Sequence, residues 1–290
     1  MLVNMKEMIE QAKKEKFAIP AFDICNYEMM RAVLEVCEEE KSPALLMVLE
    51  GDLRGKGMQL IPAMVNSASN FFSVPVCLHL DHAGNFDLIK QAIDSGFSSV
   101  MYDGSTLPFD KNLANTLEIV DYAHARSITV EAELGHVGDA MVGNENATTT
   151  GDDDPEDTLT DPTEAKIFVE KTKVDALAVA IGTSHGVYKK TPTLRIDRTK
   201  QLADCTNTPL VLHGGSGTPY DQLKEAIANG VCKINIFSDV VTALNGGLKG
   251  KLNTITNPAT WPMFVFEDAR SLMKEAVRAK IRAFGSNNRI

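Results

Sequence analysis

Residues 74–82 read Val-Pro-Val-Cys-Leu-His-Leu-Asp-His, an apolar run that is closed by an acid and a histidine. Short apolar runs of this kind are typical of buried strands, so the segment predicts a strand that ends near Asp81. Polar groups at the end of a buried strand are costly unless they are hydrogen-bonded, paired or bound to a metal. Either they are satisfied structural groups or they belong to a functional site.

Two later apolar runs end in the same way. Residues 176–185 close with Gly-Thr-Ser-His, and residues 210–213 read Leu-Val-Leu-His. Three strands that each end in a histidine indicate one metal site assembled from distant parts of the chain, with His82, His185 and His213 as its ligands. Three imidazoles that leave one position open are typical of a catalytic zinc site, whereas structural zinc sites are closed.

Apolar runs alternate with amphipathic stretches along the chain, which predicts eight strands that are each followed by a helix. The expected strands are Phe17–Asp23, Ala44–Leu49, Val76–Asp81, Ser99–Asp103, Ile128–Leu134, Asp175–Ile181, Pro209–His213 and Val231–Ile236. The expected helices include Tyr27–Glu40, Gln59–Phe72, Phe86–Ser95, Lys111–Arg126, Thr163–Thr172, Asp197–Cys205, Pro219–Asn229 and Ala269–Phe284. We expect the last of these to pack on the barrel or on a partner subunit.

Continuous aliphatic strands that are each trailed by a helix are typical of a parallel sheet covered on its outside. Closing eight of them predicts an α/β fold, a (β/α)8 TIM barrel that forms a single domain over residues 1–290. An open, doubly wound sheet is the competing architecture. The dinucleotide-binding form of the open sheet has a Gly-x-Gly-x-x-Gly motif after its first strand, and this sequence lacks that motif.

One segment departs from this pattern. Residues 136–161 are rich in Gly, Asn, Thr and Asp, and a loop of this length within a compact domain is usually functional or disordered. We expect a solvated, mobile lid after strand five. A calcium loop over residues 151–157 is the alternative, although the spaced aspartates and distal glutamate of such loops are missing.

Composition narrows the class of partner. The chain has 290 residues, of which 44% are hydrophobic, and this suffices for a large core. Its net charge of −10 argues against nucleic acid and anionic membranes as partners. The five cysteines include no Cys-x-x-Cys, so neither a disulfide framework nor a thiolate zinc site is expected. The polar start of the chain and the lack of a membrane-length apolar run predict a cytoplasmic protein.

In a barrel of this kind the chemistry lies at the carboxyl ends of the strands. The polar residues at these ends include Asp23, Glu50, Asp81, Asp103, Glu133 and Asn235. Strand seven continues as Gly214-Gly215-Ser216-Gly217 just before a helix, and strand eight ends at Asn235-Ile236-Phe237-Ser238. Barrels frequently bind phosphate with the loops after strands seven and eight and a helix N-terminus, so these residues predict a phosphate site.

The other three histidines favour structural roles. His79 shares a face of its strand with Asp81, and we expect it to orient a neighbour by hydrogen bonding. We expect His124 on the solvent side of a helix and His136 at the start of the lid.

These stretches together resemble the class II, metal-dependent ketose-bisphosphate aldolases of the fructose- or tagatose-bisphosphate type. The matching segments run in family order over essentially the whole chain. They are Pro20–Phe22, Leu78–His82, Ser99–Ser105, Val130–Gly135, Val179–Gly186, Val211–Gly217 and Lys280–Ser286.

The resemblance implies a role for each matching residue. His82, His185 and His213 would hold Zn²⁺, and Asp81 would donate and accept the proton at the C4 hydroxyl of the substrate. Asp103 and Glu133 would flank the metal or bind it alternately. The residues that would hold the phosphate and hydroxyls of dihydroxyacetone phosphate are Gly186, Gly214, Gly215, Ser216, Asn235, Ile236, Phe237 and Ser238. A monovalent cation, Na⁺ or K⁺, near these loops and a homodimer or homotetramer are further implications.

The implied reaction is the reversible cleavage of a ketose 1,6-bisphosphate to dihydroxyacetone phosphate and an aldehyde such as glyceraldehyde 3-phosphate, a step of carbohydrate metabolism such as glycolysis. The departures from the family pattern concern the aldehyde half of the substrate. Phe237 is bulkier than the usual alanine, and residues 257–260 lack an arginine often found there. The lid lacks its usual Gly-Gly-x-Glu-Asp, which leaves Asp139 and Glu145 as candidates for its acid. The same mechanism on a different phosphorylated ketose is therefore an alternative.

Two alternative functions differ from a metal-dependent aldolase in mechanism or in kind. Lys233 lies on the same face of strand eight as Asn235, and a desolvated lysine there could form an imine with a ketone, as in Schiff-base aldolases. We expect it instead to pair with a buried acid. A non-catalytic barrel subunit of a sugar-metabolism assembly is the second alternative, although such a relative would be expected to have lost Asp81 or a histidine ligand.

Overall fold

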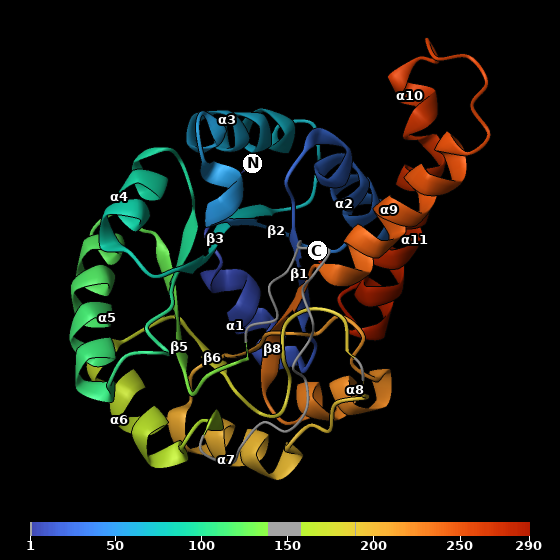
Figure 1. The fold of residues 1–290 in the computed structure, drawn as a ribbon. Helices are drawn as coiled ribbons and strands as arrows, with labels where there is room; N and C mark the ends of the chain where they lie inside the picture. Colours follow the sequence, from blue (N-terminus) through green and yellow to red (C-terminus); the bar gives the residue numbers. More distant parts are fainter. Residues whose placement is uncertain (1, 139–157, 189) are drawn as a thin grey trace.

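Eight parallel strands follow one another around a closed barrel in the computed structural model, which describes residues 2–138, 158–188 and 190–290. The barrel closes because β1 pairs with both β2 and β8 (Figure 1). The strands are β1 (Ile19–Asp23), β2 (Ala44–Leu49), β3 (Val76–Ala83), β4 (Ser99–Tyr102), β5 (Thr129–Leu134), β6 (Ala176–Val179), β7 (Leu210–Leu212) and β8 (Val231–Ile236). The predicted (β/α)8 architecture is confirmed, and the open sheet is wrong.

Helices surround the barrel and begin close to the predicted positions (Figure 1). They are α2 (Tyr27–Glu40), α3 (Gly57–Ser69), α4 (Phe86–Asp94), α5 (Phe109–His124), α6 (Pro162–Thr172), α7 (Ile196–Thr206) and α8 (Tyr220–Ala228), with a 3₁₀ turn η1 (Glu50–Leu53) after β2. Capping side chains and a proline explain where several helices begin. Asn26 caps α2 by accepting from the Met29 N–H, and Asp161 caps α6, where Pro162 suits the first turn.

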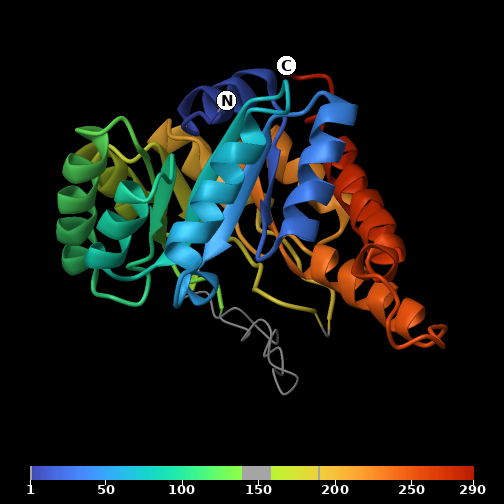
Figure 2. The ribbon, with the colours of Figure 1, turned by 90° about the horizontal axis from the view of Figure 1, so that it is seen from above.

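An additional helix, α1 (Lys6–Glu15), precedes the first strand and was not predicted. Met5, Met8, Ile9 and Ala12 are buried on one side of it and pack against the apolar residues inside the barrel. Helix α1 lies across the end of the barrel where the strands begin (Figures 1 and 2). The interior is therefore closed at this end, and the carboxyl ends of the strands form its mouth.

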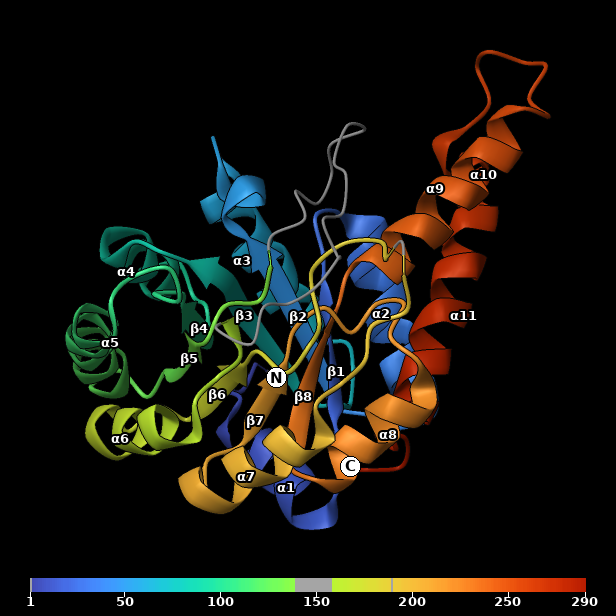
Figure 3. The same ribbon diagram turned by 60° about the horizontal axis from the view of Figure 1, so that its bottom comes forward.

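The last helices form an arm beside the barrel. Helices α9 (Ser238–Leu252) and α11 (Glu267–Ala283) pack along each other, and the short α10 (Pro262–Val265) lies at the far end (Figure 3). Helix α11 also packs along α2, where ion pairs join Arg270 to Glu28 and Lys274 to Glu39. The predicted extra C-terminal helices are thus confirmed. Within the described parts of the chain, every helix is too short or too polar to cross a membrane.

Candidate active site

The end of β3 is irregular, and the irregularity brings two polar neighbours to the mouth. Strict alternation would point Asp81 and His82 to opposite faces of the sheet. The pairing with β4 shifts register between Leu80 and Ala83, and His82 has a φ of 47°, in the left-handed region. A β-bulge of this kind re-aims side chains and is common beside active sites. Asp81 and His82 therefore both lie at the mouth.

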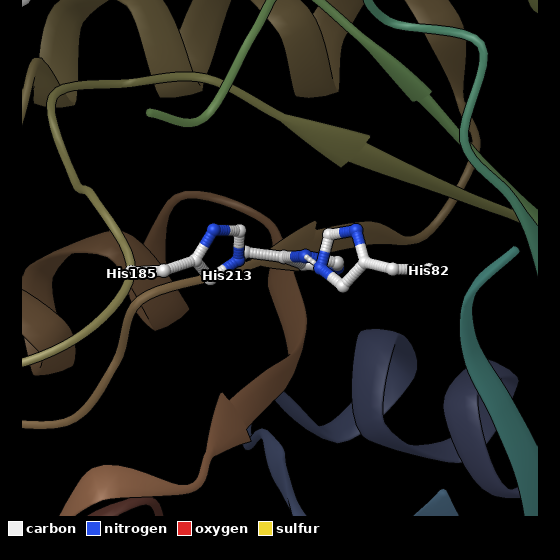
Figure 4. A group of neighbouring side chains, drawn as sticks. All are labelled: His82, His185 and His213. Carbon is white, nitrogen blue, oxygen red and sulfur yellow. Dashed lines mark hydrogen bonds between the residues drawn. The ribbon is translucent and has the colours of Figure 1, made fainter. Parts of the chain in front are cut away.

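The three predicted ligand histidines come together there, and Figure 4 shows their rings turned toward one another. Nitrogens of His82, His185 and His213 lie within 4.8 Å of one another. The ring centroid of His82 is 4.8 Å from that of His185 and 4.6 Å from that of His213. Residues from β3, from the loop after β6 and from the end of β7 thus form one cluster.

Carboxylates hydrogen-bond one ring nitrogen of each of two of these imidazoles. His82 Nδ1 lies 2.9 Å from Asp103 Oδ2, and His213 Nε2 lies 2.9 Å from Glu131 Oε1. An ionised carboxylate can only accept a hydrogen bond, so each of these nitrogens carries the proton. The other two, His82 Nε2 and His213 Nδ1, face each other at 2.8 Å, a distance at which a proton on His82 Nε2 is donated to the lone pair of His213 Nδ1. A metal ion could take the place of this proton, so the donor set fits a metal such as zinc.

The electrostatics of the mouth also favour a positive charge. Burial opposes protonation of His82, but the carboxylates of Asp81, Asp103 and Glu133 outweigh it and raise the pKa of His82 to about 10. Burial raises the pKa of Glu133 to about 8, and the charge of Asp103 adds to this effect. Burial acts on Asp103 as well, but hydrogen bonds from His82 and Ser105 hold its pKa well below the usual range.

Asp103 and Glu133 lie where the sequence predicted, next to the histidines. With His82 they form a second group that could hold a metal ion. Glu133 Oε2 is buried without a hydrogen-bond partner among the described residues and lies 3.8 Å from His213 Nδ1. A buried carboxyl oxygen in this state could bind a cation, so these acids are candidate ligands beside the three histidines.

The glycine run after β7 is packed against the neighbouring loops. A Cβ on Gly214, whose φ is +66°, would lie 2.3 Å from the Ser184 carbonyl oxygen, and one on Gly215 would lie 2.3 Å from Ile234 Cγ2. Ser216 Oγ accepts hydrogen bonds from the backbone N–H groups of Phe237 and Asp239 at the start of α9. The run thus needs glycine and lies directly at the N-terminus of a helix, where anions bind readily.

Comparison with known proteins agrees with this geometry. Residues 3–289 match the model of the family described as fructose-bisphosphate aldolase class-II. The chain belongs to the class II fructose-bisphosphate aldolase family. The predicted resemblance is confirmed, and membership of this family supports aldolase activity, with a phosphorylated ketose as substrate and dihydroxyacetone phosphate as product.

Three solved structures illustrate the similarity. The YdjI aldolase from Escherichia coli K12 is 33% identical over 99% of each chain, with a TM-score of 0.86. A candidate fructose-1,6-biphosphate aldolase from Coccidioides immitis is 30% identical over 97% of this chain and 96% of its own, with a TM-score of 0.83. The fructose-bisphosphate aldolase from Campylobacter jejuni, at 22% identity over 100% of this chain and 97% of its own, shares the fold with a TM-score of 0.82.

The site also contains a buried acid, Glu131, that was not predicted from the sequence. Glu131 binds His213 through one oxygen and the ammonium of Lys233 through the other, at 2.8 Å, and all three side chains are fully buried. The expected pairing of Lys233 with a buried acid is confirmed. The sequence did contain a signal for Glu131: it lies two residues before Glu133, so both side chains lie on the same face of β5.

The remaining histidines, His79, His124 and His136, lie outside the cluster of His82, His185 and His213. His79 Nδ1 is 2.7 Å from Ser99 Oγ, and burial together with the charge of Lys233 holds the pKa of His79 well below its usual value. This neutral, hydrogen-bonded ring agrees with the expected structural role. His124 pairs with Asp175 on the outside of the barrel, and His136 contacts Ser105.

The predicted phosphate residues divide between two places. Gly186, with a φ of +96°, follows His185, and Gly214, Gly215 and Ser216 lie at the start of α9 with Phe237 and Ser238. Asn235 instead faces the acid, because its Nδ2 donates to Asp81 Oδ1 at 3.1 Å. The side chain of Ile236 is fully buried in the core between sheet and helices, so it does not line the site. Asp139, Glu145 and the acidic run 151–157 lie outside the described residues.

Proposed function

We propose that this class II aldolase is a zinc-dependent enzyme that reversibly cleaves a ketose 1,6-bisphosphate of the fructose or tagatose type. The products are dihydroxyacetone phosphate and an aldehyde such as glyceraldehyde 3-phosphate. The observation that carries the proposal is the cluster of His82, His185 and His213 beside Asp81, with two of the imidazoles oriented by carboxylates. Catalytic zinc sites have this composition of three protein ligands and an open position.

His82, His185 and His213 would hold Zn²⁺, with Asp103 and Glu133 flanking it. A Zn²⁺ ion held by these residues would supply Lewis-acid polarisation of the substrate carbonyl and would so stabilise the negative charge that forms beside it when the C3–C4 bond breaks. The second nitrogens of His82 and His213 keep their protons, because each donates to its carboxylate. This arrangement keeps both rings in the tautomer that a metal requires.

Asp81 moves the proton. In the cleavage direction its carboxylate takes the proton of the C4 hydroxyl, and in the synthesis direction it returns that proton to the aldehyde oxygen. Asn235 donates to Asp81 Oδ1, which orients the carboxylate and leaves the second oxygen for the substrate. Asp81 is almost completely buried, so water competes little for this proton.

The loops after β7 and β8 hold the phosphate of dihydroxyacetone phosphate. Backbone N–H groups of Gly214, Gly215 and Ser216, with Gly186 on the other side and the first turn of α9 at Phe237 and Ser238, form the phosphate site. The dipole of α9 (Ser238–Leu252) adds a favourable interaction with the anion. A monovalent cation, Na⁺ or K⁺, beside these loops would balance the remaining charge.

The same mechanism on a different phosphorylated ketose is the second candidate. Phe237 stands at the start of α9 beside the proposed phosphate loops, and its large side chain is partly buried against the core. The test is a panel of aldehydes offered with dihydroxyacetone phosphate, with and without a chelator, in which product stereochemistry is scored. We expect condensation that the chelator abolishes and Zn²⁺ restores. The aldehyde used fastest identifies the substrate.

Two outcomes would contradict the proposal. A covalent adduct on Lys233 after borohydride treatment with dihydroxyacetone phosphate would establish a Schiff-base mechanism, which the ion pair of Lys233 with Glu131 disfavours. Retained zinc without cleavage of any ketose phosphate would instead support the non-catalytic barrel subunit.

A further inference from the structure

One tyrosine joins the two loops that carry His185 and His213. The backbone N–H of Ser184 donates to the hydroxyl oxygen of Tyr188 at 3.0 Å, and this hydroxyl donates to the carbonyl of Gly214 at 2.8 Å. Ser184 directly precedes His185, and Gly214 directly follows His213. The hydroxyl of Tyr188 therefore links the backbone beside two of the three proposed metal ligands.

The loops touch closely at this link. A Cβ on Gly214 would lie 2.3 Å from the Ser184 carbonyl oxygen and 3.1 Å from the Tyr188 hydroxyl. A Cβ on Gly217 would lie 3.2 Å from Cδ2 of the Tyr188 ring. The ring therefore lies against the glycine run that forms the proposed phosphate site, while its hydroxyl spans the gap between the loops.

His185 needs such a link more than the other ligands do. His82 lies within β3, and His213 directly follows β7, so the barrel holds both. His185 lies six residues beyond Val179, the last residue of β6. Its own N–H donates to the carbonyl of Gly138, which lies at the edge of the described residues. Tyr188 connects this ligand to the strand that carries His213.

We propose that Tyr188 is a positioning residue that sets the separation of His185 from His213 and holds the glycine run in place beside them. The proposal rests on the proposed function in one respect, the assignment of these histidines as ligands. Loss of the hydroxyl removes both hydrogen bonds and weakens the attachment of the His185 loop to the segment that carries His213. Removal of a group that hydrogen-bonds a metal ligand directly typically weakens metal affinity about 10- to 100-fold, and Tyr188 acts one residue further out, so we expect an effect at the lower end of this range.

The test is Tyr188→Phe, which keeps the ring and removes only the hydroxyl. We expect the Kd for Zn²⁺ to rise by about 10-fold, measured by competition with a chromogenic chelator. The visible spectrum of the Co²⁺-loaded protein should change as well, because it reports the arrangement of the ligands. Tyr122→Phe is the matched control, since Tyr122 lies on α5 outside the barrel, where its ring packs on Phe86 and Arg126.

Unchanged Zn²⁺ affinity and an unchanged Co²⁺ spectrum in Tyr188→Phe would overturn the proposal, even if the metal-free variant unfolded at a lower temperature. The metal measurements also separate this proposal from the proposed function. A wild-type protein that binds Zn²⁺ but cleaves no ketose phosphate would refute the function alone. The difference in Zn²⁺ affinity between the wild-type protein and Tyr188→Phe would then still decide the role of Tyr188.

Discussion

Glu131 shows how single buried charges shape the site. Its carboxylate lies between the Lys233 ammonium and the His213 ring, and water reaches none of the three. Lys233 balances the charge of Glu131, so His213 can stay neutral and direct Nδ1 toward His82. Burial and the charges of His82 and Lys233 also lower the pKa of His213 and so favour the neutral ring, whereas the charge of Asp81 acts to raise this pKa.

Removal of one member of this pair leaves a buried charge without its partner, so Glu131→Leu should lower the free energy of unfolding by about 3–5 kcal/mol. The double variant Glu131→Leu with Lys233→Met removes both charges, and we expect it to recover most of that loss in urea unfolding. Zn²⁺ affinity should stay about 10- to 100-fold weaker in the double variant, because His213 has lost its orienting carboxylate. Wild-type Zn²⁺ affinity in the double variant would contradict this role.

The contribution of Asp81 to turnover should be separable from zinc binding. We expect Asp81→Ala to keep its zinc, measured by metal analysis, and to lose about 10²- to 10⁴-fold in turnover, because it lacks the group that moves the C4 proton. His213→Ala is the counterpart and should lose the zinc itself. If Asp81→Ala retained most of its activity, another group would have to move the proton.

At the scale of elements, the strands were predicted and two features were missed, of which only one left a signal in the sequence. Apolar runs placed every strand, because a buried parallel strand has a continuous aliphatic sequence. The bulge at His82 depends on how β3 and β4 pair, and no local pattern reveals that. Helix α1 was detectable, since Met5, Met8, Ile9 and Ala12 follow helical spacing within a polar stretch.

Helix α1 should contribute to stability without touching the chemistry. Ile9 is 1% exposed and packs inside the barrel, so Ile9→Ala should lower the free energy of unfolding by about 2–5 kcal/mol. Glu7→Ala, on the exposed side of the same helix, is the control and should change it little. Activity at 25 °C should be the same in both variants, because α1 lies at the closed end. A large loss of turnover in folded Ile9→Ala would show that this end influences the mouth.

The contact between α2 and α11 should be sensitive to acid. A hydrogen bond from Arg282 lowers the pKa of Glu40 below its ordinary value of 4.5, and one from Lys274 does the same for Glu39. Because the folded pKa is the lower one, the stabilisation is present above pH 4.5 and is lost as the pH falls through the folded pKa. We expect Glu40→Gln to flatten the decline of unfolding free energy between pH 5 and pH 3. A decline as steep as that of the wild-type protein would contradict the ion pairs as its cause.

On the scale of the whole molecule, three distant parts of the chain meet at the proposed metal. This arrangement follows from the fold, because parallel strands all end on one side of the barrel. The identity of the three histidines was therefore predictable from strand ends alone. The link through Tyr188 could not be predicted, because its partners Ser184 and Gly214 come from different loops.

Zinc should accordingly stabilise the folded chain. A ligand that binds only the folded state adds about 2.7 kcal/mol at a free concentration of 100 Kd, so removal of zinc by a chelator should lower the Tm measurably. Re-addition of Zn²⁺ should restore it. His185→Ala should lack this response, and equal Tm values for the wild-type protein with and without chelator would show that the site is empty or is not coupled to folding.

Both ends of the chain lie on the closed side of the barrel. Figure 2 shows both ends on the side of α1. The Val3 N–H donates to the carbonyl of Val76 at the start of β3, and the Asn288 N–H donates to the carbonyl of Glu40 at the end of α2. A chain immobilised on a bead or sensor surface through either end would therefore present its mouth to the solution. Attachment through the loops after the strands would instead press the mouth against the support, so the terminal tags are the better handles for binding measurements.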